Sequence, residues 1–208
     1  MPRIAHQSKT KPILIWVGIS SLVFVPLLVA ALNPLQSSRN AAYIIATIAG
    51  VLALGLLLLQ PLLAAGYLPG LPLARTRRWH RWLGSVIVVC VVLHIGGLYL
   101  TSPPDTLDAL LLVSPTPFSV YGVTAMWGIV LTALLVAMRQ HLKLKISIWR
   151  LIHNVLAVIV VIATVVHALM IEGTMGQMSK IVLCAAVVAA TTTAVIHLRI
   201  VKPLARRD

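Results

Sequence analysis

Six long apolar stretches alternate with short polar segments along the chain. Each stretch holds close to the roughly 20 residues that an α-helix needs to cross the hydrocarbon core of a bilayer. None of them alternates in polarity as a membrane β-strand does. The pattern therefore predicts an all-α polytopic membrane protein, a bundle of six transmembrane helices, at Ile13–Leu32, Ala41–Leu63, Trp82–Leu100, Phe118–Met138, Leu151–Ile171 and Ile181–Val201.

The composition supports a lipid-facing protein and excludes several other classes. Of the 208 residues, 60% are hydrophobic and only 10% are charged, whereas a soluble domain is about 25% charged. A chain this apolar is neither a soluble domain nor a disordered one. Cys90 and Cys184 both lie inside apolar stretches, so we expect buried thiols and neither a disulfide nor a zinc site.

The basic residues are distributed unequally between the two sides of the membrane. A formal net charge of +13 would suggest a nucleic-acid partner in a soluble protein. Here the Lys and Arg residues lie in short segments between spans, where they set topology and contact anionic headgroups, so we expect lipid and no nucleic acid as a partner. One side carries only Arg39 and Lys180, and the other carries Arg3, Lys9, Lys11, Arg75, Arg77, Arg78, Arg81, Arg139, Lys143, Lys145, Arg150, Arg199, Lys202, Arg206 and Arg207.

Because segments rich in Lys and Arg face the cytoplasm, we expect both termini there. This divides the chain into a cytoplasmic tail at residues 1–12, a six-helix domain at residues 13–201 and a second cytoplasmic tail at residues 202–208. The first apolar stretch is longer than the roughly 7–15 residues of a signal-peptide core, so we expect it to be retained as a span. Without a transit sequence, a bacterial inner (plasma) membrane is the expected location.

Four histidines of the third and fifth spans are the candidate functional residues. His80 and His94 are fourteen residues apart, and so are His153 and His167. At about 100° and 1.5 Å per residue, this spacing places both members of a pair on one helix face, about 21 Å apart along its axis. Since the two spans run in the same direction, facing helices would bring His80 to His153 at one depth and His94 to His167 at another.

Two pairs of facing imidazoles indicate two b-type haems (heme b), each with two histidine ligands. Gly84 and Ala157 follow the inner histidines by one turn, which lets a flat macrocycle approach the backbone. For the anionic propionates we select Arg78, Arg81 and Arg150, which lie beside the inner pair. Membrane histidines can also pack against a neighbouring helix, or relay protons or bind a metal in a transporter, and these alternatives stay open.

The other polar candidates carry weaker signals. We expect His6 and His141 to be solvated, because they lie outside the apolar stretches. His197 lies near the cytoplasmic end of the sixth span, where we expect it to pack at the interface. Asp105 and Asp108 would attract a cation only weakly, as two carboxylates in a proline-rich loop.

At the histidine segments the chain resembles the ferric reductase-like transmembrane domain superfamily. The matching stretches are RTRRWHRWLG followed by CVVLH, WRLIHN followed by VVHALM, and SPTPFSVYG before the fourth span. Relatives include NADPH oxidases, ferric-chelate reductases and the membrane subunit of periplasmic methionine-sulfoxide reductase systems. The resemblance extends over essentially the whole six-helix body. It implies two b-type haems that carry electrons singly, one held by His80 and His153 and the other by His94 and His167.

The resemblance implies an oxidoreductase component that moves electrons from a cytoplasmic-side donor to an outer-face acceptor. The acceptor would be a ferric chelate, oxygen or a periplasmic redox protein. The sequence has no G-x-G-x-x-G dinucleotide fingerprint, so we expect the donor to be a separate flavoprotein or a quinol. The methionine-sulfoxide reductase subunit tends to lack a histidine at the position of His80, and the complete quartet here favours a stand-alone conduit.

Two alternatives remain at this point, besides a structural assembly factor, for which His→Ala changes would leave function unharmed. The first is a quinol-dependent subunit of a methionine-sulfoxide reductase-type system, with FMN or a quinone as a further cofactor beside haem. The second, of another class, is a histidine-based proton or metal transporter.

Overall fold

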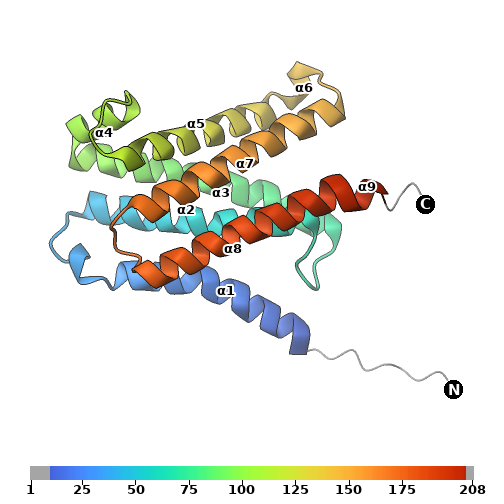
Figure 1. Cartoon of the computed structure of the whole chain (residues 1–208), viewed down its shortest axis with the longest axis horizontal. Coiled ribbons are helices and arrows are strands. Elements are labelled where there is room, and N and C mark those ends of the chain that lie inside the picture. The colour runs from blue at the N-terminus through green and yellow to red at the C-terminus, as the bar shows by residue number, and fades with distance from the viewer. Residues whose placement is uncertain (1–9, 205–208) are drawn as a thin grey trace.

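The computed structural model describes residues 10–204 and consists mainly of long helices (Figure 1). Within these residues, six helices are long and apolar enough to cross a membrane. They are α1 (Thr10–Ala31), α2 (Ala41–Ala65), α3 (Leu73–Thr101), α5 (Pro117–Ala137), α7 (Ile146–Met170) and α8 (Gln177–Ile196), which continues as a π-helix, η2 (His197–Val201). The short helices are η1 (Pro34–Gln36), α4 (Pro103–Leu110), α6 (Arg139–Leu142) and α9 (Lys202–Leu204). The predicted all-α bundle of six spans is confirmed.

Most helices begin and end within a few residues of the predicted spans, but α3 does not. It begins at Leu73, well before Trp82, because the arginine-rich segment between them is also helical. Leu, Ala and Arg all favour helices, and long arginine side chains can reach the interface while their stems stay on the helix. The predictions for Arg3, His6, Lys9, Arg206 and Arg207 fall outside the described residues.

Helix α2 lies at the centre of the bundle, in contact with α1, α3 and α8. Of its most apolar window 44% is buried, compared with 17% in α1, α3 and α7. A helix that is apolar on all sides is suited to this position. Its first turn is capped by the side chain of Asn40, which accepts a hydrogen bond from the N–H of Tyr43, and it ends at Gly66 in the left-handed conformation (φ 73°). Both predicted buried thiols, Cys90 and Cys184, are free and buried.

Two helix pairs, α2–α3 and α5–α7, make the most extensive helix–helix contacts in the described chain. Glycines allow the close approach within each pair. A Cβ at Gly97 of α3 would lie 2.5 Å from the carbonyl oxygen of Ala42 in α2, and a Cβ at Gly128 of α5 would lie 2.7 Å from Val160 of α7. The two pairs contact each other through α3 and α5, so the four helices enclose a common interior.

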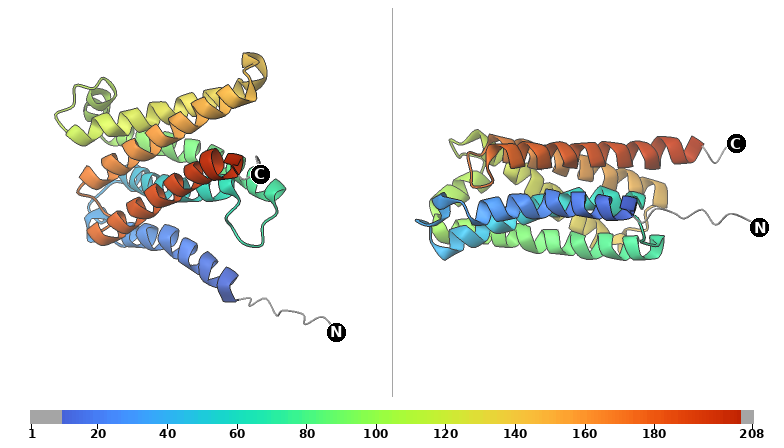
Figure 2. Two further views of the ribbon diagram at one scale, coloured as in Figure 1. Left: turned by 45° about the vertical axis from the view of Figure 1, so that its right-hand side comes forward. Right: turned by 90° about the horizontal axis from the view of Figure 1, so that it is seen from below.

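The charged residues separate toward the two ends of the bundle. The start of α1, the α2–α3 turn, α6 and α9 lie at one end, and η1, α4 and the α7–α8 turn lie at the other (Figures 1 and 2). Among the described residues, the first end holds every Lys and Arg except Arg39 and Lys180, and we call it the basic end. Asp105, Asp108 and Glu172 belong to the opposite end.

Candidate paired-histidine site

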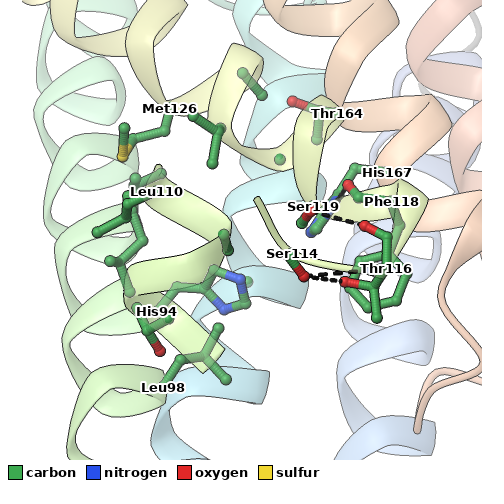
Figure 3. Close-up of a pocket in the computed structure, with 18 of the residues that line it drawn as sticks. His94, Leu98, Leu110, Ser114, Thr116, Phe118, Ser119, Met126, Thr164 and His167 are labelled. Atoms are coloured by element: carbon green, nitrogen blue, oxygen red, sulfur yellow. Dashed lines mark hydrogen bonds between the residues drawn. The ribbon is translucent and has the colours of Figure 1, made fainter. Parts of the chain in front are cut away.

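The four candidate histidines line two cavities that are enclosed mainly by α2, α3, α5 and α7. The inner cavity, nearer the basic end, has a volume of about 540 Å³ and contains His80 and His153. The outer cavity has a volume of about 430 Å³ and contains His94 and His167 (Figure 3). Both volumes lie in the range of roughly 300–1,000 Å³ that small-molecule and cofactor sites occupy. The structure thus brings the histidines together in the pairs expected from their spacing.

The two outer histidines are oriented in the same way by two different helices. Nδ1 of His94 lies 2.8 Å from the carbonyl oxygen of Ala46 in α2, and Nδ1 of His167 lies 2.8 Å from that of Phe118 in α5. A carbonyl oxygen can only accept, so in each ring Nδ1 carries the proton and donates, and Nε2 keeps its lone pair. Metal-ligating histidines commonly have this arrangement, because the hydrogen bond fixes the tautomer and makes the ligand more basic.

A glycine four residues after each accepting carbonyl leaves the helix surface open to the ring. A helical side chain covers the turn that precedes its own Cα, so any side chain at these positions would compete with the imidazole. A Cβ at Gly50 would lie 2.9 Å from Nδ1 of His94, and a Cβ at Gly122 would lie 2.7 Å from Cε1 of His167. Neither glycine was predicted from the sequence as part of the site. The signal that could have found them is a glycine in the apolar helix preceding each histidine helix.

The inner histidines are oriented differently from each other. Nδ1 of His80 lies 3.1 Å from the carbonyl oxygen of Gln60 in α2. The buried Nδ1 of His153 has no hydrogen-bond partner within the described part of the chain. Its ring is instead stacked on Trp149, with the ring centroids 5.2 Å apart and the planes at 7°. The centroids of His80 and His153 are 6.3 Å apart, with the ring planes at 69°.

The spacing of His80 and His153 would let the two imidazoles hold one metal ion, such as a haem iron, between them. Two metal–nitrogen bonds of about 2 Å, together with the distance from each ring nitrogen to its ring centre, separate such imidazoles by roughly 6 Å. The observed 6.3 Å between His80 and His153 agrees with this value. Gly84 and Ala157, the small residues expected beside the macrocycle, also line the inner cavity. Among residues 10–204, no group of three or more His, Cys, Asp or Glu side chains could hold a metal ion.

The arginines expected near the haem propionates differ in their positions. Arg81 lines the inner cavity. Arg78 and Arg150 are exposed at the basic end and do not line this cavity. Arg199 of the π-helix, which the sequence analysis did not select, donates from Nη2 to the carbonyl oxygen of Arg150 at 2.6 Å. With its amide oxygen turned toward the guanidinium, Asn154 accepts from Nε of Arg199 at 2.7 Å. Because Asn154 lines the inner cavity, Arg199 adds a positive charge close to it.

The weaker candidates take part in local contacts. The ring of His197 lies edge-on to Tyr67, with the centroids 5.4 Å apart, and His141 is exposed in α6. Asp105 accepts a hydrogen bond from the Ser102 hydroxyl at 2.6 Å and lines the rim of the outer cavity. The contact with Tyr67 agrees with the packing role expected for His197.

The family comparison agrees with this arrangement of helices. The family model described as ferric reductase like transmembrane component matches residues 49–164, more than half of the chain. The chain belongs to the ferric reductase-like transmembrane family. The match extends from α2 into α7 and includes His80, His94 and His153, while His167 lies just beyond it. No curated protein and no solved structure matches the chain. Membership supports a multi-pass membrane protein with a role in transmembrane electron transfer.

Proposed function

We propose that this ferric reductase-like protein is a transmembrane b-type cytochrome that moves single electrons through two bis-histidine haems. The observation that carries the proposal is that α3 and α7 supply two histidine pairs, each in its own cavity. His80 and His153 would hold the inner haem, and His94 and His167 the outer one. When bound, each haem iron alternates between the ferric and ferrous states and so carries one electron.

The protein orients the ligands and keeps the two sites close together. Carbonyl groups of α2 and α5 hold Nδ1 of His80, His94 and His167, which leaves Nε2 of each ring as the donor atom. Leu57, Ile87 and Ile129 line both cavities. Apolar side chains therefore lie between the two sites.

The charge distribution supports a direction for the electrons. Because positively charged segments face the cytoplasm, the basic end is the proposed cytoplasmic end, next to the inner pair. The donor there would be a separate flavoprotein or a quinol. The acceptor at the outer face would be a ferric chelate, oxygen or a periplasmic redox protein, and the membrane would be a bacterial plasma membrane.

A dithionite-reduced minus oxidised spectrum of the purified protein, with a haem count by pyridine haemochrome, tests the proposal. We expect low-spin b-type bands and two haems per chain. His94→Ala should remove the outer haem and spare the inner one, whereas His141→Ala, at an exposed histidine of α6, should leave both. A colourless protein expressed with haem available would overturn the proposal in favour of a transporter. One haem per chain would favour a quinol-linked haem and flavin subunit instead.

A further inference from the structure

One of the four histidines lacks the backbone hydrogen bond that orients the other three. His80, His94 and His167 each place Nδ1 between 2.8 and 3.1 Å from a helix carbonyl oxygen. Within the described chain, the buried Nδ1 of His153 has no such partner. A hydrogen bond from the second nitrogen normally fixes the orientation of a ligating imidazole. The plane of the His153 ring therefore has to be determined by something else.

The sequence of α5 explains why no carbonyl oxygen of this helix accepts a hydrogen bond from Nδ1 of His153. Thr132 lies as far along α5 from Phe118 as Gln60 lies along α2 from Ala46, so its carbonyl occupies the equivalent register. Four residues further on, α2 has the small Ala64, whereas α5 has the β-branched Val136. A side chain four residues later covers the turn that holds the carbonyl. Both Thr132 and Val136 line the inner cavity, where Val136 leaves less room for an imidazole beside that turn.

Trp149 contacts His153 in place of a carbonyl. It precedes His153 by four residues on α7, so the two side chains lie on the same helix face. The rings are stacked with planes 7° apart, and the indole N–H donates to the carbonyl oxygen of Leu135 at 3.3 Å. The guanidinium of Arg139 lies over the Trp149 ring, 4.9 Å from its centroid. The indole is thus itself fixed on two sides, by α5 and by the start of α6.

We infer that Trp149 is the positioning residue for His153, and that His153 is the most readily displaced of the four ligands. Stacking fixes the plane of the imidazole but provides no proton acceptor for Nδ1. His153 therefore lacks the hydrogen bond that makes the other three imidazoles more basic. This inference rests on the proposed function, since it concerns ligands of a haem in the inner cavity.

Carbon monoxide binding to the dithionite-reduced, full-length protein tests the inference, because carbon monoxide binds a bis-histidine haem only when a ligand leaves. We expect Trp149→Leu to increase the affinity for carbon monoxide by about tenfold or more at one haem, a size typical of losing an outer contact to a ligand. Trp149→Phe, which keeps an aromatic plane, should stay within about twofold of the unmodified protein. Trp127→Leu, at an exposed, lipid-facing tryptophan of α5, is the matched control. Its carbon monoxide affinity should also stay within about twofold of that of the unmodified protein.

The ferric low-spin electron paramagnetic resonance signal provides a second readout, because its anisotropy depends on the angle between the two axial ring planes. The planes of His80 and His153 are at 69°, so we expect a strongly anisotropic signal from the inner haem. Trp149→Leu should change this signal and Trp149→Phe should restore it. A general loosening of the fold would not be rescued by Phe, and so would not give this result.

The outcomes separate this inference from the proposed function. If the unmodified protein binds two haems but Trp149→Leu leaves carbon monoxide affinity and the resonance signal unchanged, the inference is wrong and the function stands. The inference is also wrong, and the function stands, if Trp149→Phe changes the carbon monoxide affinity as much as Trp149→Leu does. A loss of both haems in Trp149→Leu would lead to the same conclusion. If the unmodified protein binds no haem, both proposals are wrong.

Discussion

A histidine inside a membrane span is best suited to bind a metal when one ring nitrogen is hydrogen-bonded and the other faces a cavity. His94 and His167 meet this condition, because Ala46 and Phe118 accept the proton of Nδ1. The accepting group is a backbone carbonyl, which every residue carries. What differs from one turn of a helix to another is whether a side chain covers that carbonyl. At the residue scale, Gly50 and Gly122 therefore help to orient the outer pair, because they leave the accepting carbonyl groups uncovered.

Gly122→Ala tests this role of the glycine. The added Cβ would lie 2.7 Å from Cε1 and 2.8 Å from Nδ1 of His167, so the ring has to leave its carbonyl partner. We expect haem affinity at the outer site to fall by about tenfold, the lower end of the range for losing an outer contact to a ligand. The haem content after detergent dilution, measured by pyridine haemochrome, gives the result. Gly18→Ala, with no atom within 4 Å of the added Cβ, is the control, and equal haem loss in both variants would contradict the prediction.

Side-chain chemistry could be predicted at this scale, and backbone chemistry could not. Helix geometry places His80 and His94 on one helix face, and likewise His153 and His167. The structure places His80 and His153 in the lining of one cavity, and His94 and His167 in that of the other. The carbonyl partners could not be predicted, since sequence letters do not specify which turn of α2 or α5 faces an imidazole. The stacking on Trp149 was missed for a related reason, because it depends on rotamers that only packing determines.

At the scale of elements, the site depends on how closely α2 approaches α3. Gly97 sets this distance, because a Cβ there would lie 2.5 Å from the carbonyl oxygen of Ala42 and 2.8 Å from Cβ of Ala46. Neither is a flexible side-chain end that could turn away. The same turn of α2 carries the carbonyl that holds His94. Close packing of the two helices and orientation of the ligand are thus one structural feature.

Gly97→Ala should therefore affect both stability and the outer site. Overpacking of a close contact typically costs about 1–3 kcal/mol, so we expect a lower melting temperature of the protein in detergent, together with a smaller haem content. Gly96→Ala is the adjacent control on the same helix, since its added Cβ would have no atom within 4 Å. Light-scattering or intrinsic-fluorescence melts of the two variants measure the difference. A melting temperature for Gly97→Ala equal to that of Gly96→Ala would show that the helices can separate without cost.

The number and type of the long elements could be predicted, but their ends and the short elements could not. Hydropathy identifies the segment that lies in lipid, so it found each span. It carries no information about a helix that continues into the interface, and α3 therefore begins at Leu73 and not at Trp82. The outer-loop helix α4 (Pro103–Leu110) is amphipathic and short, and its sequence signal was too weak to separate it from a loop.

At the scale of the whole molecule, the two ends of the bundle differ in charge and in the polar groups beside the two cavities. The inner cavity has Arg81 in its lining and Arg199 beside Asn154, whereas the outer cavity has hydroxyl groups and Asp105 at its rim. An anionic group, such as a propionate of the proposed haem, would therefore be stabilised better at the basic end. Under the proposed orientation, this end faces the cytoplasm.

Cysteine labelling tests this orientation. In a Cys90→Ala, Cys184→Ala background, Asp108→Cys places a thiol on exposed α4 and His141→Cys places one on exposed α6, at the opposite end. Since Lys- and Arg-rich segments are retained in the cytoplasm, a membrane-impermeant maleimide should label Asp108→Cys in intact cells and His141→Cys only after permeabilisation. The reverse pattern would place the inner pair at the outer face and would reverse the proposed direction of electron transfer. Equal labelling of both in intact cells would mean that the chain inserts in two orientations, in which case the charge asymmetry does not determine its topology.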